Sequence, residues 1–277
     1  YSSYPSCVDR RAFMTLLALG TVEVLTACGK SSAEEAVANT SSAPTNGPTA
    51  TAAPSTANLP LQSALPATKR PTPTGQIDRL PGRGRFLSLT VDDGASSEVV
   101  GAYADFARET GARFTFFVTG QYDSWRDNRK ALLPLVESGQ IQLSNHSWSH
   151  PDLTTLSAKS VADELGRTGK FLRNQFGVEA APYFRPPFGN HNAAVDAVAA
   201  DAGYTVPVLW YGSLSDSGEI TEKYLLQVAR QYLRAQRIVI GHANHAPVTR
   251  VFGELAEIIQ RRRLQMVTLD DYFARPA

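Results

Sequence analysis

From about residue 77 onwards, hydrophobic and polar positions follow two alternating patterns. Short apolar runs rich in β-branched and aromatic residues predict strands buried on both faces. These runs lie at 85–91, 113–118, 141–144, 183–185, 205–209, 237–240 and 264–269. Between them, apolar residues three and four positions apart predict helices at 97–109, 126–138, 157–176, 192–202, 221–234 and 251–262.

Strands that alternate with helices are normally parallel and joined by right-handed crossovers. The pattern therefore predicts an α/β fold, and a seven-stranded barrel fits it best. An open doubly wound sheet is the alternative, although no glycine-rich phosphate loop in the sequence supports it. In either case the chain is long enough for one sizeable domain.

The N-terminal residues show a different pattern, which is typical of an export signal. The pair Arg10-Arg11 precedes an apolar run at 13–26, which is shorter than the roughly 20 residues needed to span a membrane. The run ends in Leu25-Thr26-Ala27-Cys28. In this order, the segments resemble a twin-arginine signal and the lipobox of bacterial lipoproteins. We expect residues 1–28 to direct export, with Cys28 lipidated; an uncleaved amphipathic tail is the alternative.

The next segment, residues 29–76, is rich in Ser, Thr, Ala and Pro and predicts a disordered tether. Residues 77–277 are then the folded domain, held on the outer face of the cell membrane, on the cell-wall side. A net charge of +1 gives no electrostatic argument for a nucleic-acid partner. Both cysteines, Cys7 and Cys28, precede the domain, so any metal in the domain must be bound by His, Asp or Glu.

Residues able to carry chemistry follow the predicted strands. Asp92, Asp93 and Gly94 end the first strand, and His146 and His150 follow the third. The carboxyl ends of barrel strands meet on one rim, where active sites are built. Two histidines four residues apart share one face of a helical turn, and with Asp93 they suit a divalent metal ion.

Later strands add further candidates to this rim. Arg185 could pair with Asp92, although a solvated arginine is the plainer interpretation. Trp210 and Tyr211 offer flat faces suited to sugar rings, or they are ordinary packing at the rim. A single histidine, His242, follows the sixth strand.

Taken together, these motifs resemble those of the NodB-type polysaccharide deacetylases, carbohydrate esterase family 4, over residues 84–270. The motifs are Thr90-Val91-Asp92-Asp93-Gly94, His146-Ser147-Trp148-Ser149-His150, Arg185-Pro186-Pro187-Phe188-Gly189 and Ile240-Gly241-His242. The resemblance implies a distorted (β/α)7 barrel. It also implies a metal-dependent hydrolase that removes N-acetyl groups from a cell-wall or other N-acetylated polysaccharide.

The resemblance also implies a role for each matched residue. Asp92 would be the catalytic base, Arg185 would position it, and His242 would be the general acid, tuned by Asp216. The implied metal ligands are Asp93, His146 and His150, with zinc as the expected ion and cobalt or manganese as alternatives. The implied substrate-binding residues are Pro187, Phe188, Trp210, Tyr211 and Ile240.

One departure from the family pattern bears on the substrate. Ser217 follows Asp216 where the family usually has tryptophan, so the choice of glycan stays open. Two other functions also stay open: a non-catalytic glycan-binding lipoprotein on the same barrel, and a hydrolase of other acyl amides or esters. The expected partners are an N-acetylated glycan and, through the lipid anchor, a membrane, with the protein as a monomer.

Overall fold

The computed structural model describes Leu61 and residues 64–275, and the strands among them form one sheet. The predicted export region, the lipidation site Cys28 and most of the predicted tether lie outside the described residues. The strands are β1 (Phe86–Asp93), β2 (Phe114–Val118), β3 (Ile141–Asn145), β4 (Tyr183–Phe184), β5 (Val206–Pro207), β6 (Gly212–Ser213), β7 (Arg237–His242) and β8 (Gln265–Met266).

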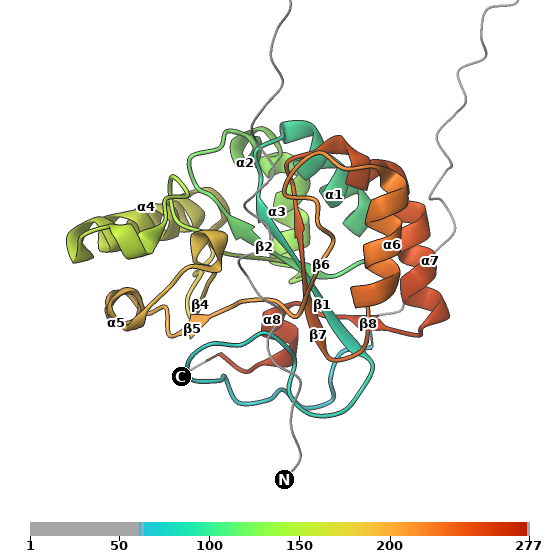
Figure 1. Cartoon of the computed structure of the whole chain (residues 1–277), viewed down its shortest axis with the longest axis horizontal. Helices are drawn as coiled ribbons and strands as arrows, with labels where there is room; N and C mark the ends of the chain where they lie inside the picture. Colours follow the sequence, from blue (N-terminus) through green and yellow to red (C-terminus); the bar gives the residue numbers. More distant parts are fainter. Residues whose placement is uncertain (1–60, 62–63, 276–277) are drawn as a thin grey trace, which may run out of the picture. The chain divides into compact units, whose positions relative to one another are not determined.

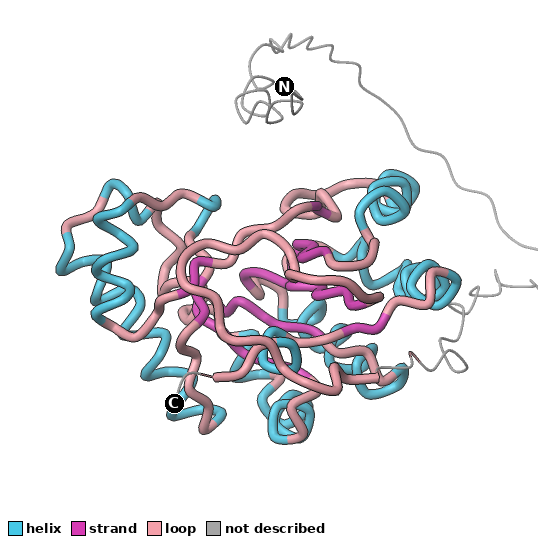
Figure 2. The backbone as a smooth tube through the Cα atoms, turned by 90° about the horizontal axis from the view of Figure 1, so that it is seen from below, coloured by secondary structure: helices cyan, strands magenta, loops and turns pink. Residues whose placement is uncertain are grey.

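Every strand pairing in this sheet is parallel, and β1 pairs with three other strands, β2, β7 and β8. The order is β5-β4-β3-β2-β1-β7-β6, with β8 paired to the start of β1. The sheet curls into a half-barrel with helices around it (Figures 1 and 2). This arrangement confirms the predicted distorted (β/α)7 fold. The short strand β6 was not predicted, because two residues are too few to produce a hydrophobic pattern.

A helix follows most of the strands, as the sequence predicts. They are α1 (Ser97–Thr110), α2 (Ser124–Asp127), α3 (Arg129–Glu137), α4 (Ala158–Phe176), α5 (Ala193–Asp201), α6 (Glu222–Tyr232), α7 (Phe252–Arg261) and α8 (Leu269–Tyr272). The helix predicted at 126–138 is divided at Asn128 into α2 and α3. The last predicted strand is also shorter than expected, because α8 begins at Leu269.

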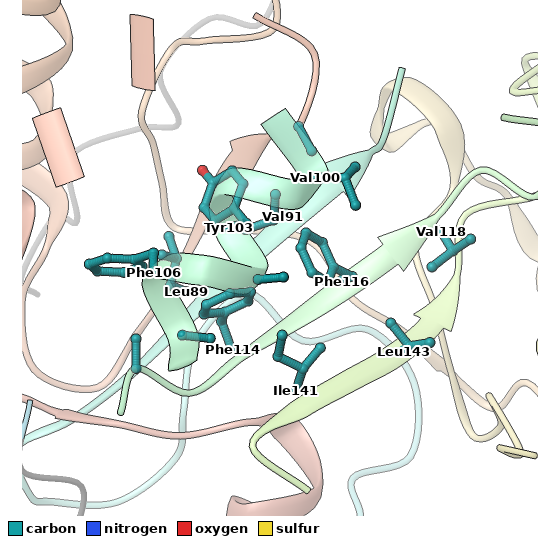
Figure 3. Packing of buried hydrophobic residues seen from close by; sticks show 14 of the residues in the cluster. Leu89, Val91, Val100, Tyr103, Phe106, Phe114, Phe116, Val118, Ile141 and Leu143 are labelled. Carbon is teal, nitrogen blue, oxygen red and sulfur yellow. The ribbon is translucent and has the colours of Figure 1, made fainter. Parts of the chain in front are cut away.

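The main hydrophobic core lies between the sheet and the helices that cover it. Leu89 and Val91 on β1 and Phe116 on β2 point toward Tyr103 and Phe106 of α1 (Figure 3). Alternate strand residues point to the other face of the sheet, where Phe117 belongs to a second buried cluster. On β1 this second face carries Asp92, so the alternation that builds the core also places a carboxylate inside the barrel.

The segment before β1 lies against the domain. Leu61 is buried, and its backbone N–H donates to the carbonyl of Thr110 at 2.7 Å. The Arg70 N–H donates to the Tyr272 carbonyl, and the Gly75 N–H donates to that of Thr205. These contacts hold residues 70–76 on the domain, whereas the sequence predicts a tether as far as residue 76. Across the described part of the chain, no helix has the length and hydropathy needed to cross a membrane.

Candidate active site

The predicted chemical residues lie at the carboxyl ends of neighbouring parallel strands. Asp92 at the end of β1 is in register with His242 at the end of β7. His146 directly follows β3, and Arg185 directly follows β4. The backbone N–H of Arg185 donates to the Asn145 carbonyl at 2.9 Å, which joins these two strand ends. The parallel topology therefore gathers groups from four separate strands.

Asp93, His146 and His150 offer three ligand atoms that all lie within 4.8 Å of one another. The distance from Asp93 Oδ1 is 3.4 Å to His146 Nε2 and 3.3 Å to His150 Nε2. Asp93 reaches this position because its backbone has a φ of 71°. That left-handed conformation turns its side chain out of the strand alternation, so that Asp92 and Asp93 serve one site.

The hydrogen bonds around these residues fit a divalent metal ion. His146 Nδ1 lies 2.7 Å from the carbonyl oxygen of Arg185, which can only accept, so Nδ1 carries a proton and, in the neutral imidazole, Nε2 is the nitrogen that presents a lone pair. The buried Asp93 Oδ1 has no hydrogen-bond partner among the described residues. A buried carboxylate oxygen without a donor, beside two imidazole nitrogens, is the ligand set that zinc and similar ions bind.

The electrostatics keep this carboxylate ionised. Burial by itself would raise the pKa of Asp93, but the nearby imidazoles of His146, His242 and His150, with His146 contributing most, favour the ionised carboxylate and hold the pKa well below its usual range. The pKa of His150 is lowered by its burial and by the charge of His146. The site therefore presents an ionised carboxylate and a neutral His150 at neutral pH, which are the forms that bind metal.

The loop that carries His150 is fixed by a residue that no motif indicated. Glu164 on α4 accepts hydrogen bonds from the backbone N–H groups of Trp148 at 2.8 Å and Ser149 at 2.7 Å. The His150 N–H donates to Ser147 Oγ at 3.1 Å, and both residues have positive φ. Since that backbone conformation is unfavourable for residues with a side chain, the Glu164 contacts stabilise the loop.

Asp92 forms a buried ion pair with Arg185, the contact that the sequence suggested. Arg185 is fully buried, and its Nε and Nη2 donate to the carbonyls of Val208 at 2.8 Å and Leu209 at 3.3 Å. Its guanidinium lies 4.2 Å from the centre of the Phe117 ring. Burial lowers the pKa of Arg185, while Asp92 acts in the opposite direction. These contacts hold the Asp92 carboxylate in one orientation.

His242 and Asp216 form a second pair beside Asp92. His242 Nδ1 lies 3.0 Å from Asp216 Oδ1, and the His242 backbone N–H donates to Oδ2 at 3.2 Å. Burial opposes the charged imidazole, but the Asp216 hydrogen bond and charge prevail, so the pKa of His242 is raised. With Nδ1 bonded to Asp216, Nε2 is the nitrogen that can gain or lose a proton.

Four of the five predicted substrate-binding residues lie at or near this rim. Phe188 is 64% exposed, and its ring meets that of His150 edge-on at 4.6 Å. Pro187 is buried beside it, and the buried Ile240 precedes His242 by two positions on β7. Trp210 lies 5.6 Å from the Arg185 guanidinium, measured to its ring centre.

The structure does not bring the fifth residue, Tyr211, to the site. Its ring lies between the guanidinium groups of Arg79 at 4.9 Å and Arg237 at 3.3 Å. Arg237 begins β7, whereas His242 ends it. Tyr211 therefore lies near the start of β7, where its backbone N–H donates to the Ile238 carbonyl at 2.9 Å.

Two further residues hold Asp93 and were missed by the sequence analysis. Asn244 Nδ2 donates to Asp93 Oδ2 at 2.7 Å, while Asn244 Oδ1 accepts from the Ala95 N–H at 3.0 Å. The indole Nε1 of Trp125 donates to the Asp93 carbonyl at 3.2 Å. Asn244 follows His242, the last residue of β7, by two positions, so its place after a barrel strand could have indicated a site residue. For Trp125 no local sequence pattern indicates this contact.

Comparison with known proteins supports the predicted relationship with NodB-type polysaccharide deacetylases. Residues 80–207 match the family model of the polysaccharide deacetylases. The matched segment contains Asp92, Asp93, His146, His150 and Arg185, and it ends before Asp216 and His242.

Individual relatives agree with the family match. Chitin deacetylase 1 of Cryptococcus neoformans var. grubii is 38% identical over 122 residues, covering 44% of this chain and 25% of that protein. Peptidoglycan-N-acetylglucosamine deacetylase PgdA of Listeria monocytogenes is 28% identical over 196 residues, covering 68% of this chain and 38% of that protein. The chain thus spans well under half the length of these two curated relatives.

The fold also matches a solved structure. A CE4 family pseudoenzyme from Bacillus anthracis superposes with a TM-score of 0.63 at 19% identity, covering 71% of this chain and 68% of that one. This likeness concerns the fold alone, so activity must be argued from the residues of the site.

Proposed function

We propose that this protein is a metal-dependent deacetylase that hydrolyses N-acetyl groups of a polysaccharide, a hydrolase acting on carbon–nitrogen bonds other than peptide bonds. The observation that carries the proposal is the convergence of three groups of residues on one rim. They are the metal-ligand set, the Asp92–Arg185 pair and the His242–Asp216 pair. The similarity of this chain to chitin and peptidoglycan deacetylases supports an N-acetylated glycan as the substrate.

Amide hydrolysis requires an activated water, stabilisation of the carbonyl oxygen as it becomes negative, and a proton for the departing amine. A divalent ion held by Asp93, His146 and His150 would supply positive charge that acidifies water and stabilises the developing oxyanion. Asp92 is the residue placed to remove the proton of the attacking water. Arg185 keeps its carboxylate in position, and both side chains are shielded from solvent.

His242 is the proposed proton donor to the leaving amine. Its raised pKa keeps Nε2 protonated to higher pH than an ordinary imidazole, because Asp216 favours the charged form. Each pair thus serves one proton transfer. The Asp92 carboxylate receives a proton from water, and the His242 imidazolium gives one to the amine. The two acid–base groups stand on adjacent strands in register, so one substrate carbonyl can reach both.

We propose zinc as the metal, with cobalt and manganese as alternatives, because two imidazoles and one carboxylate leave coordination positions for water and substrate. Phe188, exposed beside His150, is the proposed contact for a sugar ring, with Trp210 and Ile240 forming the wall near the acetyl group.

The test is acetate release from N-acetylglucosamine oligomers and from peptidoglycan. The protein is first stripped of metal, and zinc, cobalt or manganese is then restored, with Asp92→Asn assayed beside the wild type. Metal-restored release that disappears in Asp92→Asn is the expected result, and comparison of the substrates indicates the glycan. The Asp92→Asn variant must retain its fold and metal affinity for this comparison, which circular dichroism and zinc titration establish.

Two other outcomes would replace the proposal. If the zinc-loaded protein releases no acetate from glycans but hydrolyses small amides or acetyl esters, it is a hydrolase of other acyl groups. If it binds glycan oligomers without hydrolysing any of these substrates, it is a glycan-binding protein on a deacetylase fold.

We further propose that the protein is monomeric and acts outside the cell, held to the membrane by lipid on Cys28 and a tether that begins at residue 29. The order of the arginine pair, the apolar run and the lipobox supports this placement. Metabolic labelling with a radioactive fatty acid should mark the wild-type protein and leave Cys28→Ser unmarked. Light scattering of the purified protein tests the monomer.

A further inference from the structure

Arginines gather at the edge of the sheet where β1, β7 and β8 begin, which is the end opposite the candidate active site. We call this cluster the basic face; it includes residues from the segment before β1 and from the carboxyl ends of α6 and α7. Its members are Arg70, Arg79, Arg83, Arg85, Arg230, Arg234, Arg237, Arg261, Arg262 and Arg263. All are exposed except Arg237 and Arg262, which are half-buried.

Contacts across the edge join the segments that carry these arginines. Arg85 Nη1 donates to the carbonyl of Arg262 at 3.0 Å. Arg262 in turn donates to the carbonyls of Leu233 and Arg230, both at 2.6 Å. The start of β1 and the ends of α6 and α7 are thereby joined, as the ribbon also shows (Figure 1).

The segment before β1 extends the surface. Arg79 pairs with Arg237 in an antiparallel bridge, and the two guanidinium groups lie on the ring of Tyr211. Tyr211 is 42% exposed. Arg70 approaches from the same segment, since a Cβ added to Gly82 would lie 2.6 Å from Arg70 Nη2. An exposed aromatic ring therefore lies within the basic face.

Few carboxylates balance this charge. Among the described residues, only Asp78 and Glu257 form ion pairs with members of the basic face, with Arg79 and Arg261, each at 2.8 Å. The pKa of Arg262 is lowered by its burial and by the charge of Arg234.

Other arginines near the starts of the strands or the ends of the helices show the opposite behaviour. Arg113 before β2, Arg173 in the last turn of α4, and Arg275 near the C-terminus form ion pairs with Asp271, Glu179 and Asp270, respectively. The excess of positive charge is therefore confined to one part of this edge. It is a local feature and not a general property of the fold.

The helix dipole accounts for only part of the cluster. Arginines are favoured in the last turn of a helix, which explains Arg230 and Arg261. It does not explain Arg79, Arg83 or Arg85, which precede the first strand. Like charges brought together without partners destabilise the folded state, so a surface of this kind is typical of one that meets an anionic partner.

We propose that the basic face binds the anionic head groups of a phospholipid membrane. Three observations favour a membrane over a soluble polyanion. The arginines come from several elements and form a face, the exposed Tyr211 among them is a side chain suited to the membrane interface, and residues 70–85 join the domain at this same edge. This inference does not depend on the proposed catalytic activity.

The orientation follows from the strands. Arg237 begins β7 and His242 ends it, so the basic face and the candidate active site are separated by about 16 Å along five residues of strand. A domain bound through the basic face therefore presents the active site away from the bilayer, where a wall polymer can reach it.

The experiment measures partition of the full-length chain carrying Cys28→Ser into vesicles. Vesicles of phosphatidylcholine alone are compared with vesicles that also contain phosphatidylglycerol, at low and high salt. A patch variant, R83E/R234E/R263E, is compared with a control variant, K130E/K170E/K223E. The control changes the net charge equally at exposed lysines on α3, α4 and the start of α6. The N-terminal residues are identical in all three proteins, so they contribute equally.

We expect the wild type and the control to bind the anionic vesicles more tightly than the neutral ones, and salt to weaken this binding. Each arginine at an anionic surface contributes about a fivefold change in affinity, so the patch variant should bind on the order of a hundredfold more weakly. Equal weakening in the patch and control variants would overturn the proposal. It would also be overturned if wild-type binding were independent of salt, or if the chain bound soluble polyphosphate and not anionic vesicles.

Discussion

Replacing Arg185 by methionine tests whether the buried ion pair with Asp92 organises the site. Methionine fills similar space and removes the charge. The variant leaves the Asp92 carboxylate buried without its cation, and the carbonyls of Val208 and Leu209 each lose a donor. Removing one partner of a buried pair costs about 3–5 kcal/mol. That is a large share of the roughly 5–15 kcal/mol by which a domain is stable.

Urea denaturation followed by tryptophan fluorescence measures this loss. The matched control is Arg173→Met, because Arg173 pairs with Glu179 at the surface, with side chains 53% and 49% exposed. An exposed pair contributes at most about 1 kcal/mol. If Arg185→Met costs no more than Arg173→Met, the reasoning is wrong.

A double variant makes the test specific to the pair. In the Asp92→Asn background, position 92 carries no charge that loses its partner when Arg185 is replaced. Arg185→Met should therefore lower the free energy of unfolding by about 0.5–3 kcal/mol less than it does in the wild type. Equal costs in the two backgrounds would show that Arg185 stabilises the protein only through its packing and its carbonyl contacts.

Three further predictions concern function. As the proposed proton donor, His242 must be protonated, so the rate should fall as the pH rises through the pKa of His242. Asp216→Asn should move this fall to lower pH, because the raised pKa of His242 depends on the Asp216 charge. A rate that falls at the same pH in the variant and the wild type would refute this. Asn244→Ala should weaken zinc binding about 10–100-fold in calorimetric titration, because Asp93 loses the donor that orients it; unchanged affinity would contradict this role. Phe188→Ala should raise KM for glycan oligomers with little change in kcat, as steady-state kinetics can show, since we propose that the exposed ring contacts the sugar and not the reacting atoms.

The sequence predicts the fold well because the longer strands are short runs of apolar and small polar residues that are buried on both faces, as expected for a parallel sheet covered on both sides. It predicts the site for the same reason: Asp92, His146, Arg185 and His242 each follow such a run, and parallel strands end at a common rim. The hydrophobic pattern thus predicts where the strands end and which residues follow them.

The features that were missed depend on contacts between distant residues. Glu164 lies on an ordinary amphipathic helix, and only the folded chain places its carboxylate on the N–H groups of Trp148 and Ser149. Tyr211 was expected at the rim because it follows an apolar run, yet its ring packs against Arg79 and Arg237 near the start of β7. No local pattern predicts these contacts, since both arginines are distant from Tyr211 in the sequence.

The turn after β1 shows how the core fixes the backbone of a proposed metal ligand. A Cβ on Gly94 would lie 2.3 Å from the Trp125 ring, and the Trp125 indole donates to the Asp93 carbonyl. The fully buried Trp125 therefore fixes the backbone that presents Asp93. A ligand held this way needs no reorganisation when an ion arrives, so the entropy of ordering it has already been lost in folding. Metal affinity should accordingly respond to substitutions in the hydrophobic core around Trp125, although none of those residues offers a ligand atom.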